Sequence, residues 1–120
     1  MNYWIMPYTN RLSSNYEKHT NIALDYDETF TSNRSLWTQF VSLVKQYNCT
    51  ITFVTYRFEN SDNKDICNDA ETLGIDIVFS GGKPKSSVFK ADIWIDDSPI
   101  TIPSYQGMQE MLDNAPILNK

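Results

Sequence analysis

The sequence predicts a single α/β domain built around a mainly parallel sheet. Short apolar segments rich in β-branched residues alternate along the chain with amphipathic segments of helical length. This alternation is typical of βαβ units, in which each helix carries the chain back to the start of the next parallel strand. The 120 residues suffice for one domain with its own core, since a chain of this length buries roughly two-thirds of its unfolded surface.

The first half of the chain contains two expected strands with a helix between them. Residues 21–24 are a short apolar run and are expected to form a buried strand. Residues 34–47 have apolar side chains at helical spacing, and Ser32 or Asn33 is the expected N-cap. Residues 50–57 are β-branched and aromatic, which favours a second strand. The expected buried stripe of the helix is Leu36, Phe40, Leu43, Val44 and Tyr47.

The second half of the chain continues the same alternation. A helix is expected to begin at Asn60 or Ser61 and to end at Gly74, which can adopt the left-handed conformation, with Ile75 as the apolar residue that follows. Its expected buried stripe is Ile66, Ala70 and Leu73. The remaining expected elements are a strand at 75–80, a short helical turn at 83–91, a strand at 92–97 and a last helix at 104–113.

Residues 1–20 are expected to form an N-terminal arm and linker ahead of a domain that spans residues 21–120. Residues 9–20 are polar and lack apolar periodicity, which is typical of a linker. The aromatic residues before them indicate a segment folded back on the domain. The alternatives are a dimer contact, which would make a homo-oligomer through the arm, and a flap over the functional site.

The composition restricts the partners and the location that we expect. The net charge of −5 and the pI near 4.6 argue against binding of long nucleic acid or of an anionic membrane. Cys49 and Cys67 are isolated and are expected to be reduced thiols, and His19 has no neighbouring residue that would make it a catalytic base. Without a signal-peptide pattern or a long apolar run, the protein is expected to be soluble and cytoplasmic.

Chemically active side chains gather where the expected strands end. Ligands of such sheets bind at the carboxyl ends of the strands. Several carboxylates at one place would raise one another's pKa unless a cation were present, and a site of oxygen ligands that also holds phosphate favours Mg²⁺. The set therefore predicts a phosphoryl-transfer site with a carboxylate nucleophile. Its members are Asp25 and Asp27 after the first strand, Thr55 at the end of the second, Lys83 and Lys85 after the third, and Asp96 and Asp97 at the end of the fourth.

These strand ends resemble the four motifs of the haloacid dehalogenase (HAD)-like hydrolase superfamily. DYDET resembles its DxDx[TV] motif, FVTYR its hydrophobic strand ending in Ser or Thr, GGKPK its lysine, and WIDDSP its acidic pair. The motifs occur in the family's order over residues 22–98. The resemblance implies a three-layer Rossmann-like fold with a mainly parallel central sheet. It also implies a Mg²⁺-dependent phosphatase that hydrolyses a phosphomonoester through an aspartyl-phosphate. Because the segments between the motifs are short, the chain resembles a small member without a cap domain.

The resemblance implies a role for each residue of the first two motifs. Asp25 would attack the phosphorus, form the aspartyl-phosphate and bind Mg²⁺. Asp27 would protonate the leaving oxygen and later activate water, while its main-chain carbonyl binds the metal. Thr55 would hold a phosphoryl oxygen.

The third and fourth motifs complete the implied site. A lysine would neutralise charge between the nucleophile and the phosphate; Lys85 is preferred because it stands where a helical turn would begin after the Gly-Gly turn, and Lys83 is the alternative. Asp96 and Asp97 would hold the metal, directly or through water. The substrate would be a small phosphorylated molecule, with a nucleotide and a phosphorylated nucleic-acid end as two options.

Three other classes of protein were weighed against this interpretation. An EF-hand calcium loop does not fit, because Phe30 and Leu36 stand where such a loop needs Gly and Glu. Receiver domains of signalling proteins use Asp, Thr and Lys on a similar sheet, but their acidic pair comes early in the chain and not last. A non-catalytic or regulatory module that binds phosphate or a partner through the same pocket remains an alternative.

Overall fold

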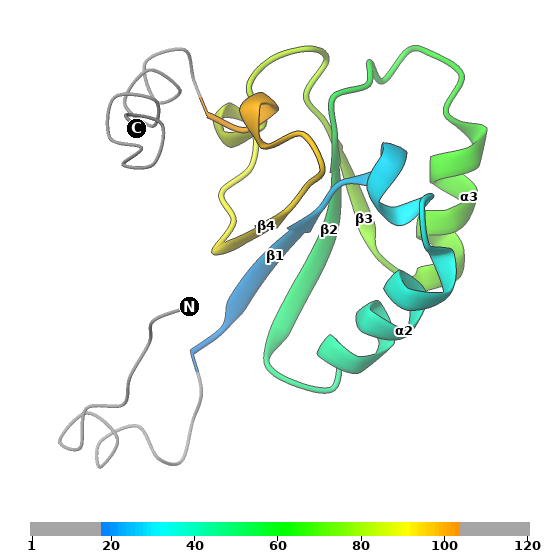
Figure 1. The fold of residues 1–120 in the computed structure, drawn as a ribbon, viewed down its shortest axis with the longest axis vertical. Helices are drawn as coiled ribbons and strands as arrows, with labels where there is room; N and C mark the ends of the chain where they lie inside the picture. The colour runs from blue at the N-terminus through cyan, green and yellow to red at the C-terminus, as the bar shows by residue number, and fades with distance from the viewer. Residues whose placement is uncertain (1–17, 104–120) are drawn as a thin grey trace, which may run out of the picture.

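The computed structural model of this chain describes residues 18–103. Its centre is a four-stranded sheet in the order β3-β2-β1-β4, and every neighbouring pair is parallel. Figure 1 shows β4 at one edge of the sheet and the helix α3 beyond the other edge. The predicted α/β class with a mainly parallel sheet is confirmed. The strands are β1 (Thr20–Leu24), β2 (Cys49–Thr55), β3 (Asp76–Phe79) and β4 (Ile93–Ile95).

Two helices and two short turns connect the strands, and a third short turn follows β4. The helices are α2 (Arg34–Val44) and α3 (Lys64–Leu73), and the turns are η1 (Tyr26–Phe30), η2 (Lys85–Ser87) and η3 (Pro99–Thr101). The helical turn expected within 83–91 is found as η2. Of the expected arm and linker at 1–20, residues 1–17 lie outside the described residues, and Thr20 already belongs to β1; the expected last helix at 104–113 also lies outside them. None of the helices within residues 18–103 has the length and apolar character needed to cross a bilayer.

Helix α2 begins where the sequence indicates but buries a different face. The side chain of Asn33 accepts a hydrogen bond from the backbone N–H of Leu36, so Asn33 is the N-cap. The expected stripe is wrong in part, because Leu36, Leu43 and Tyr47 are exposed. The buried face is rotated by about one residue, since positions spaced by three, four and seven residues from Trp37 share one side of a helix. That face is formed by Trp37, Phe40, Val41 and Val44.

Helix α3 begins two or three residues later than its expected caps. Its N-cap is Asn63, not Asn60 or Ser61. The amide group of Asn63 donates to the carbonyls of Phe58, Glu59 and Ser61, so the preceding residues form a loop and not a first turn. The end of the helix is confirmed: Gly74 has φ +70°, and Ile75 N–H donates to Ala70 O at 3.0 Å.

Both helices pack on the same face of the sheet. The core cluster joins Val41 of α2 and Ile66 and Ala70 of α3 to alternate residues of β1 and β2. The two helices also contact each other. The described residues therefore form two layers, and they do not establish the three-layer arrangement that the resemblance implies. They include no cap domain, because only short loops follow β1 and β3.

We expect the central strand to carry much of the stability of the core. Leu24 of β1 is fully buried, whereas Leu43 of α2 is 51% exposed. Leu24→Ala should lower the free energy of unfolding by about 2–5 kcal/mol, because it leaves a cavity in the core. Leu43→Ala is the matched control and should change it by about 0.5 kcal/mol or less. Urea unfolding measures both values, and equal losses would contradict this assignment of the core.

Candidate functional site

Strand pairing brings three of the predicted residues to one edge of the sheet. Leu24 of β1 pairs with Phe53 of β2 on one side and with Ile95 of β4 on the other. The chain then continues from the adjacent strand ends as Asp25, Thr55 and Asp96. The backbone N–H of Asp25 still donates to Ile95 O at 2.9 Å, so the nucleophile candidate is held in the sheet.

A buried lysine joins two of these carboxylates. Lys85 Nζ lies 2.8 Å from Asp25 Oδ1 and 2.6 Å from Asp96 Oδ2. The side chains of Lys85, Asp25 and Asp96 are 2%, 8% and 3% exposed, so this ion-pair triad is shielded from water. Of the two candidate lysines, the structure brings Lys85 to Asp25 and leaves Lys83 exposed.

The loop after β3 directs Lys85 back towards the sheet. Gly81 and Gly82 both have positive φ, a conformation that side-chain-bearing residues rarely adopt. Their N–H groups donate to the carbonyls of Arg57 and Tyr56, which joins this loop to the one after β2. The turn η2 then begins at Lys85. The Gly-Gly pair therefore acts as turn geometry that presents the lysine.

The environment of Asp25 raises the pKa of its carboxyl group towards neutral pH. Burial raises the pKa of Asp25 from 3.8 to about 6, while the hydrogen bond and positive charge of Lys85 oppose that rise. The negative charge of Asp96 contributes a further increase. Asp25 is thus still mainly ionised at pH 7, in the form that a carboxylate nucleophile needs.

Thr29 links the two acidic motifs. Its hydroxyl lies 3.0 Å from Asp25 Oδ2 and 3.2 Å from Asp97 Oδ1, and it accepts a hydrogen bond from the backbone N–H of Asp97 at 3.1 Å. Sequence reasoning quoted this threonine in the motif but assigned it no role. The turn η1 brings the hydroxyl of Thr29, four residues after Asp25, back to the Asp25 carboxylate.

Three carboxylates lie close enough to share a cation. One oxygen each of Asp25, Asp96 and Asp97 lies within 4.8 Å of the others, and Lys85 is the one cationic side chain that contacts them among the described residues. Three acids against one ammonium group leave an excess of negative charge at a site of oxygen donors. This donor set fits Mg²⁺. The side chain of Asp27 is not part of the cluster, and the role of its main-chain carbonyl stays a prediction.

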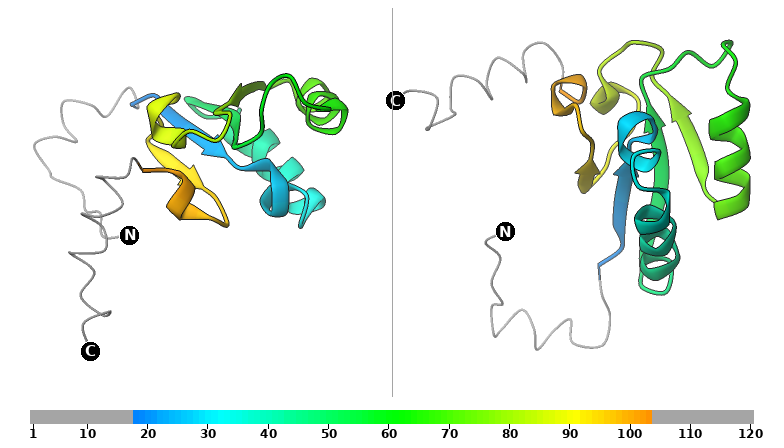
Figure 2. Two further views of the ribbon diagram at one scale, coloured as in Figure 1. Left: turned by 90° about the horizontal axis from the view of Figure 1, so that it is seen from above. Right: turned by 45° about the vertical axis from the view of Figure 1, so that its right-hand side comes forward.

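The side chain of Asp27 binds Arg57, whereas its implied role as proton carrier would direct it towards the substrate. Arg57 Nε and Nη2 donate to its two carboxylate oxygens at 2.9 and 2.7 Å. The backbone of η1 allows this orientation, because Asp27 is extended and Glu28 has φ +65°. Figure 2 shows η1 directly after the carboxyl end of β1. Both carboxylate oxygens of Asp27 therefore accept hydrogen bonds from Arg57.

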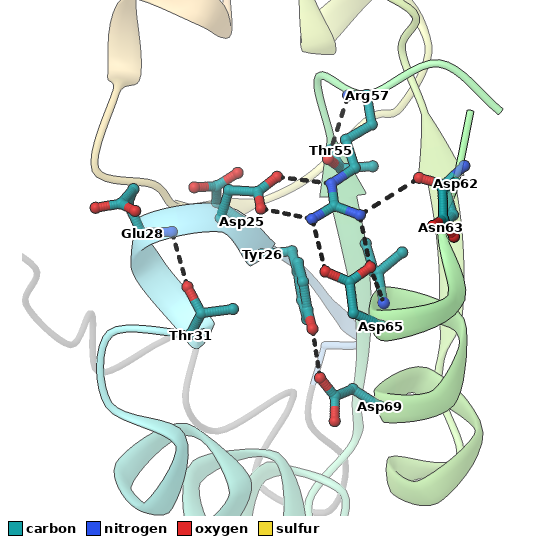
Figure 3. Close-up of polar contacts among 12 residues, drawn as sticks. Asp25, Tyr26, Glu28, Thr31, Thr55, Arg57, Asp62, Asn63, Asp65 and Asp69 are labelled. Carbon is teal, nitrogen blue, oxygen red and sulfur yellow. Dashed lines mark hydrogen bonds and ion pairs between the residues drawn. The ribbon is translucent and has the colours of Figure 1, made fainter. Parts of the chain in front are cut away.

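Arg57 is the centre of a second polar network, which Figure 3 shows between η1 and α3. Its Nη1 and Nη2 donate to the two oxygens of Asp65 at 2.7 and 2.9 Å, and its guanidinium lies 5.2 Å from the centre of the Tyr26 ring. Hydrogen bonding to Arg57 lowers the pKa of Asp65 to about 2. Sequence analysis missed Arg57 as a site residue. Its position two residues after Thr55 was the available signal, since alternate residues of an extended segment point the same way.

Thr55 ends β2, two residues before Arg57. Its side chain is buried, and its hydroxyl accepts a hydrogen bond from the backbone N–H of Arg57 at 3.3 Å. Its position at the end of β2 is the predicted one. The hydroxyl hydrogen is free to point at an anionic oxygen, because this contact uses Thr55 as an acceptor.

Comparison of the chain with family models, with curated proteins and with solved structures gave no match. A buried carboxylate, a buried ammonium group, three acidic side chains close enough to share a cation and a threonine hydroxyl lie at the carboxyl edge of β1, β2 and β4. Such a set can bind a phosphoryl group and present a nucleophile to it.

The contrast between the two lysines can be measured as stability. Lys85→Met should lower the free energy of unfolding by about 3–5 kcal/mol in metal-free buffer at pH 7, because it leaves Asp25 and Asp96 buried without their cation. Lys83→Met is the control and should cost about 0.5 kcal/mol or less. Chemical denaturation provides the measurement, and similar losses for the two variants would show that Lys85 is not the buried partner.

Tyr26 should make stability depend on alkaline pH. Burial and the hydrogen bond to Asp69 raise the pKa of Tyr26 from 10.0 to about 12, against an opposing effect of Arg34. Because the folded-state value is the higher one, the stabilisation is complete below pH 10 and is lost as the pH rises towards 12. Over that window the wild type should lose about 2 kcal/mol relative to Tyr26→Phe, which does not ionise. Unfolding curves at stepped pH test this, and parallel profiles would refute it.

Proposed function

We propose that this chain is a Mg²⁺-dependent phosphomonoester hydrolase of the HAD-like superfamily. The observation that carries the proposal is the buried Asp25, joined by Lys85 to Asp96 and lying within 4.8 Å of Asp96 and Asp97 oxygens. A structural ion pair would not need a third carboxylate beside it. The order of the acidic residues along the chain supports a hydrolase over a receiver domain.

Asp25 would act as the nucleophile. One of its carboxylate oxygens would form a bond to phosphorus as the bond between phosphorus and the ester oxygen breaks, which gives an aspartyl-phosphate and an alcohol. Water would then cleave the acyl phosphate and regenerate the carboxylate. Lys85 would offset the negative charge that gathers between the carboxylate and the phosphoryl oxygens, and its position 2.8 Å from Asp25 supports this role.

The metal would be held by Asp25, Asp96 and Asp97. Bound there, Mg²⁺ would neutralise phosphoryl charge and orient the phosphoryl group for in-line attack. Thr29 supports the arrangement, since its hydroxyl bridges Asp25 and Asp97. Thr55 would donate its hydroxyl hydrogen to a phosphoryl oxygen.

Asp27 would be the proton carrier of the reaction. It would give a proton to the leaving oxygen and later take one from the attacking water. Arg57 occupies both of its carboxylate oxygens, so this contact must open before Asp27 can reach the leaving oxygen. The same contact favours a second candidate function, a phosphate-binding module in which Asp27 stays paired with Arg57 and does not act as a general acid.

Phosphate release from a panel of phosphomonoesters, including nucleotides and nucleic-acid ends, tests the proposal. The wild type should release phosphate in Mg²⁺ and lose that activity in a chelator. Asp25→Asn should lower kcat at least about 10⁴-fold, as expected on removal of the nucleophile. Activity that persists in Asp25→Asn or without a divalent metal would overturn the mechanism.

A control variant and a binding measurement distinguish a phosphatase from a phosphate-binding module. Asp92→Asn is the control, because Asp92 is an exposed carboxylate near β4 that binds Asn21 N–H and is outside the cluster. It should keep the activity of the wild type. If no ester is hydrolysed but phosphate and Mg²⁺ still raise the midpoint of thermal unfolding, the binding module is the better assignment.

A further inference from the structure

Arg57 presents two separate binding edges to its surroundings. One edge, Nη1 and Nη2, binds Asp65 with a pair of hydrogen bonds, and the other, Nε and Nη2, binds Asp27 in the same way. The Tyr26 ring lies against the guanidinium at 5.2 Å and restricts its orientation. A planar guanidinium held in this way is suited to bidentate binding of a carboxylate.

The edge that binds Asp65 is built into the start of α3. Asp65 also accepts the backbone N–H of Ile66 at 2.8 Å. Arg57 Nη1 has a further contact with Asn63, whose buried amide ties together the preceding loop. This edge therefore anchors the guanidinium to the fold.

The edge that binds Asp27 is the replaceable one. Within residues 18–103, Arg57 is the one partner of the Asp27 carboxylate, whereas Asp65 also binds Ile66 N–H; the two side chains are similarly exposed, at 50% and 53%. Ion pairs of this exposure contribute little net stability, about 0–1 kcal/mol. Another carboxylate could take the place of Asp27 at low cost, and Asp27 is the residue that the proposed reaction needs to be free.

We propose that Arg57 is the specificity residue for a carboxylate on the substrate, so that the preferred substrates are phosphomonoesters of hydroxycarboxylic acids. The substrate carboxylate would bind the Nε and Nη2 edge of Arg57 in place of Asp27. The displaced Asp27 would then be available to the leaving oxygen. This inference rests on the proposed phosphatase function and adds the class of leaving group.

Arg57 lies close to the proposed phosphoryl site, which supports the replacement of Asp27 by a substrate carboxylate. Its backbone N–H donates to Thr55 Oγ1, the hydroxyl proposed to hold phosphate, and Gly81 N–H donates to its carbonyl at 2.9 Å. The guanidinium and the phosphate site are thus carried by one strand end. A substrate with its phosphate and carboxylate on one short molecule could contact both.

The test compares ω-carboxyalkyl phosphates with alkyl phosphates of equal length, in a series of increasing chain length. At the best length the wild type should prefer the carboxylated ester by about 10- to 100-fold in kcat/KM, as expected for a charge-assisted pair of hydrogen bonds. Arg57→Gln should reduce this ratio to about one. Arg57→Lys keeps the charge but not the fork, so it should lose most of the preference.

Arg34→Gln is the matched control. Arg34 also pairs with an aspartate and lies over an aromatic ring, at 5.3 Å from Phe30, but it has no contact with Asp27. It should keep the wild-type ratio, and circular dichroism verifies that each variant is folded. Equal kcat/KM for the two ester series in the wild type, or a preference that survives in Arg57→Gln, would overturn the inference.

Failure of the proposed function would give a different pattern. If no ester is hydrolysed, the phosphatase assignment is wrong, and ligand binding then decides the role of Arg57. Carboxyalkyl phosphates should still raise the midpoint of thermal unfolding more than alkyl phosphates in the wild type and equally in Arg57→Gln. Equal rises in the wild type would overturn the inference as well.

Discussion

The buried contact of Lys85 with Asp25 and Asp96 is the interaction on which the rest of the site depends. It brings together residues that follow three parallel strands. Asp25 and Asp96 follow the neighbouring strands β1 and β4, and Lys85 lies after the loop that follows β3. Burying any one of these three charged groups without its partners would lower the stability of the fold. The ammonium group lowers the pKa of Asp25 against the effect of burial, so that the carboxylate stays reactive near neutral pH.

A second network keeps Asp27, the proposed proton carrier, apart from Asp25, the proposed nucleophile. Arg57 and Asp65 hold Asp27 on the side of α3, while the triad lies on the side of β4. The two networks lie next to each other at the end of β1, because Tyr26 follows Asp25 in the chain and its ring lies against Arg57. This arrangement separates two carboxylates that stand two residues apart in the chain, and it reduces the repulsion between them.

Much of the fold was readable from local pattern, and the errors have identifiable causes. The strands, the Asn33 cap and the Gly74 stop depend on residues near in sequence, and they were predicted. The buried face of α2 was misassigned, because Leu36 and Leu43 are apolar and yet lie beside the packed stripe. The choice between Lys83 and Lys85 needed the path of the Gly81–Gly82 turn, which spacing alone does not supply. Arg57 was missed because its partners, Asp27 and Asp65, lie on different elements.

The sequence by itself determined the alternation of strands and helices and the residue types at each strand end. Period and composition are local properties, and they suffice to place acids, a hydroxyl and lysines at one edge of a parallel sheet. The tertiary structure alone decided which of them touch. It paired Lys85 with Asp25 and Asp96, and it turned Asp27 towards Arg57. Both outcomes depend on contacts between residues distant along the chain, and for Lys85 the cost of leaving a buried charge unpaired selects the arrangement.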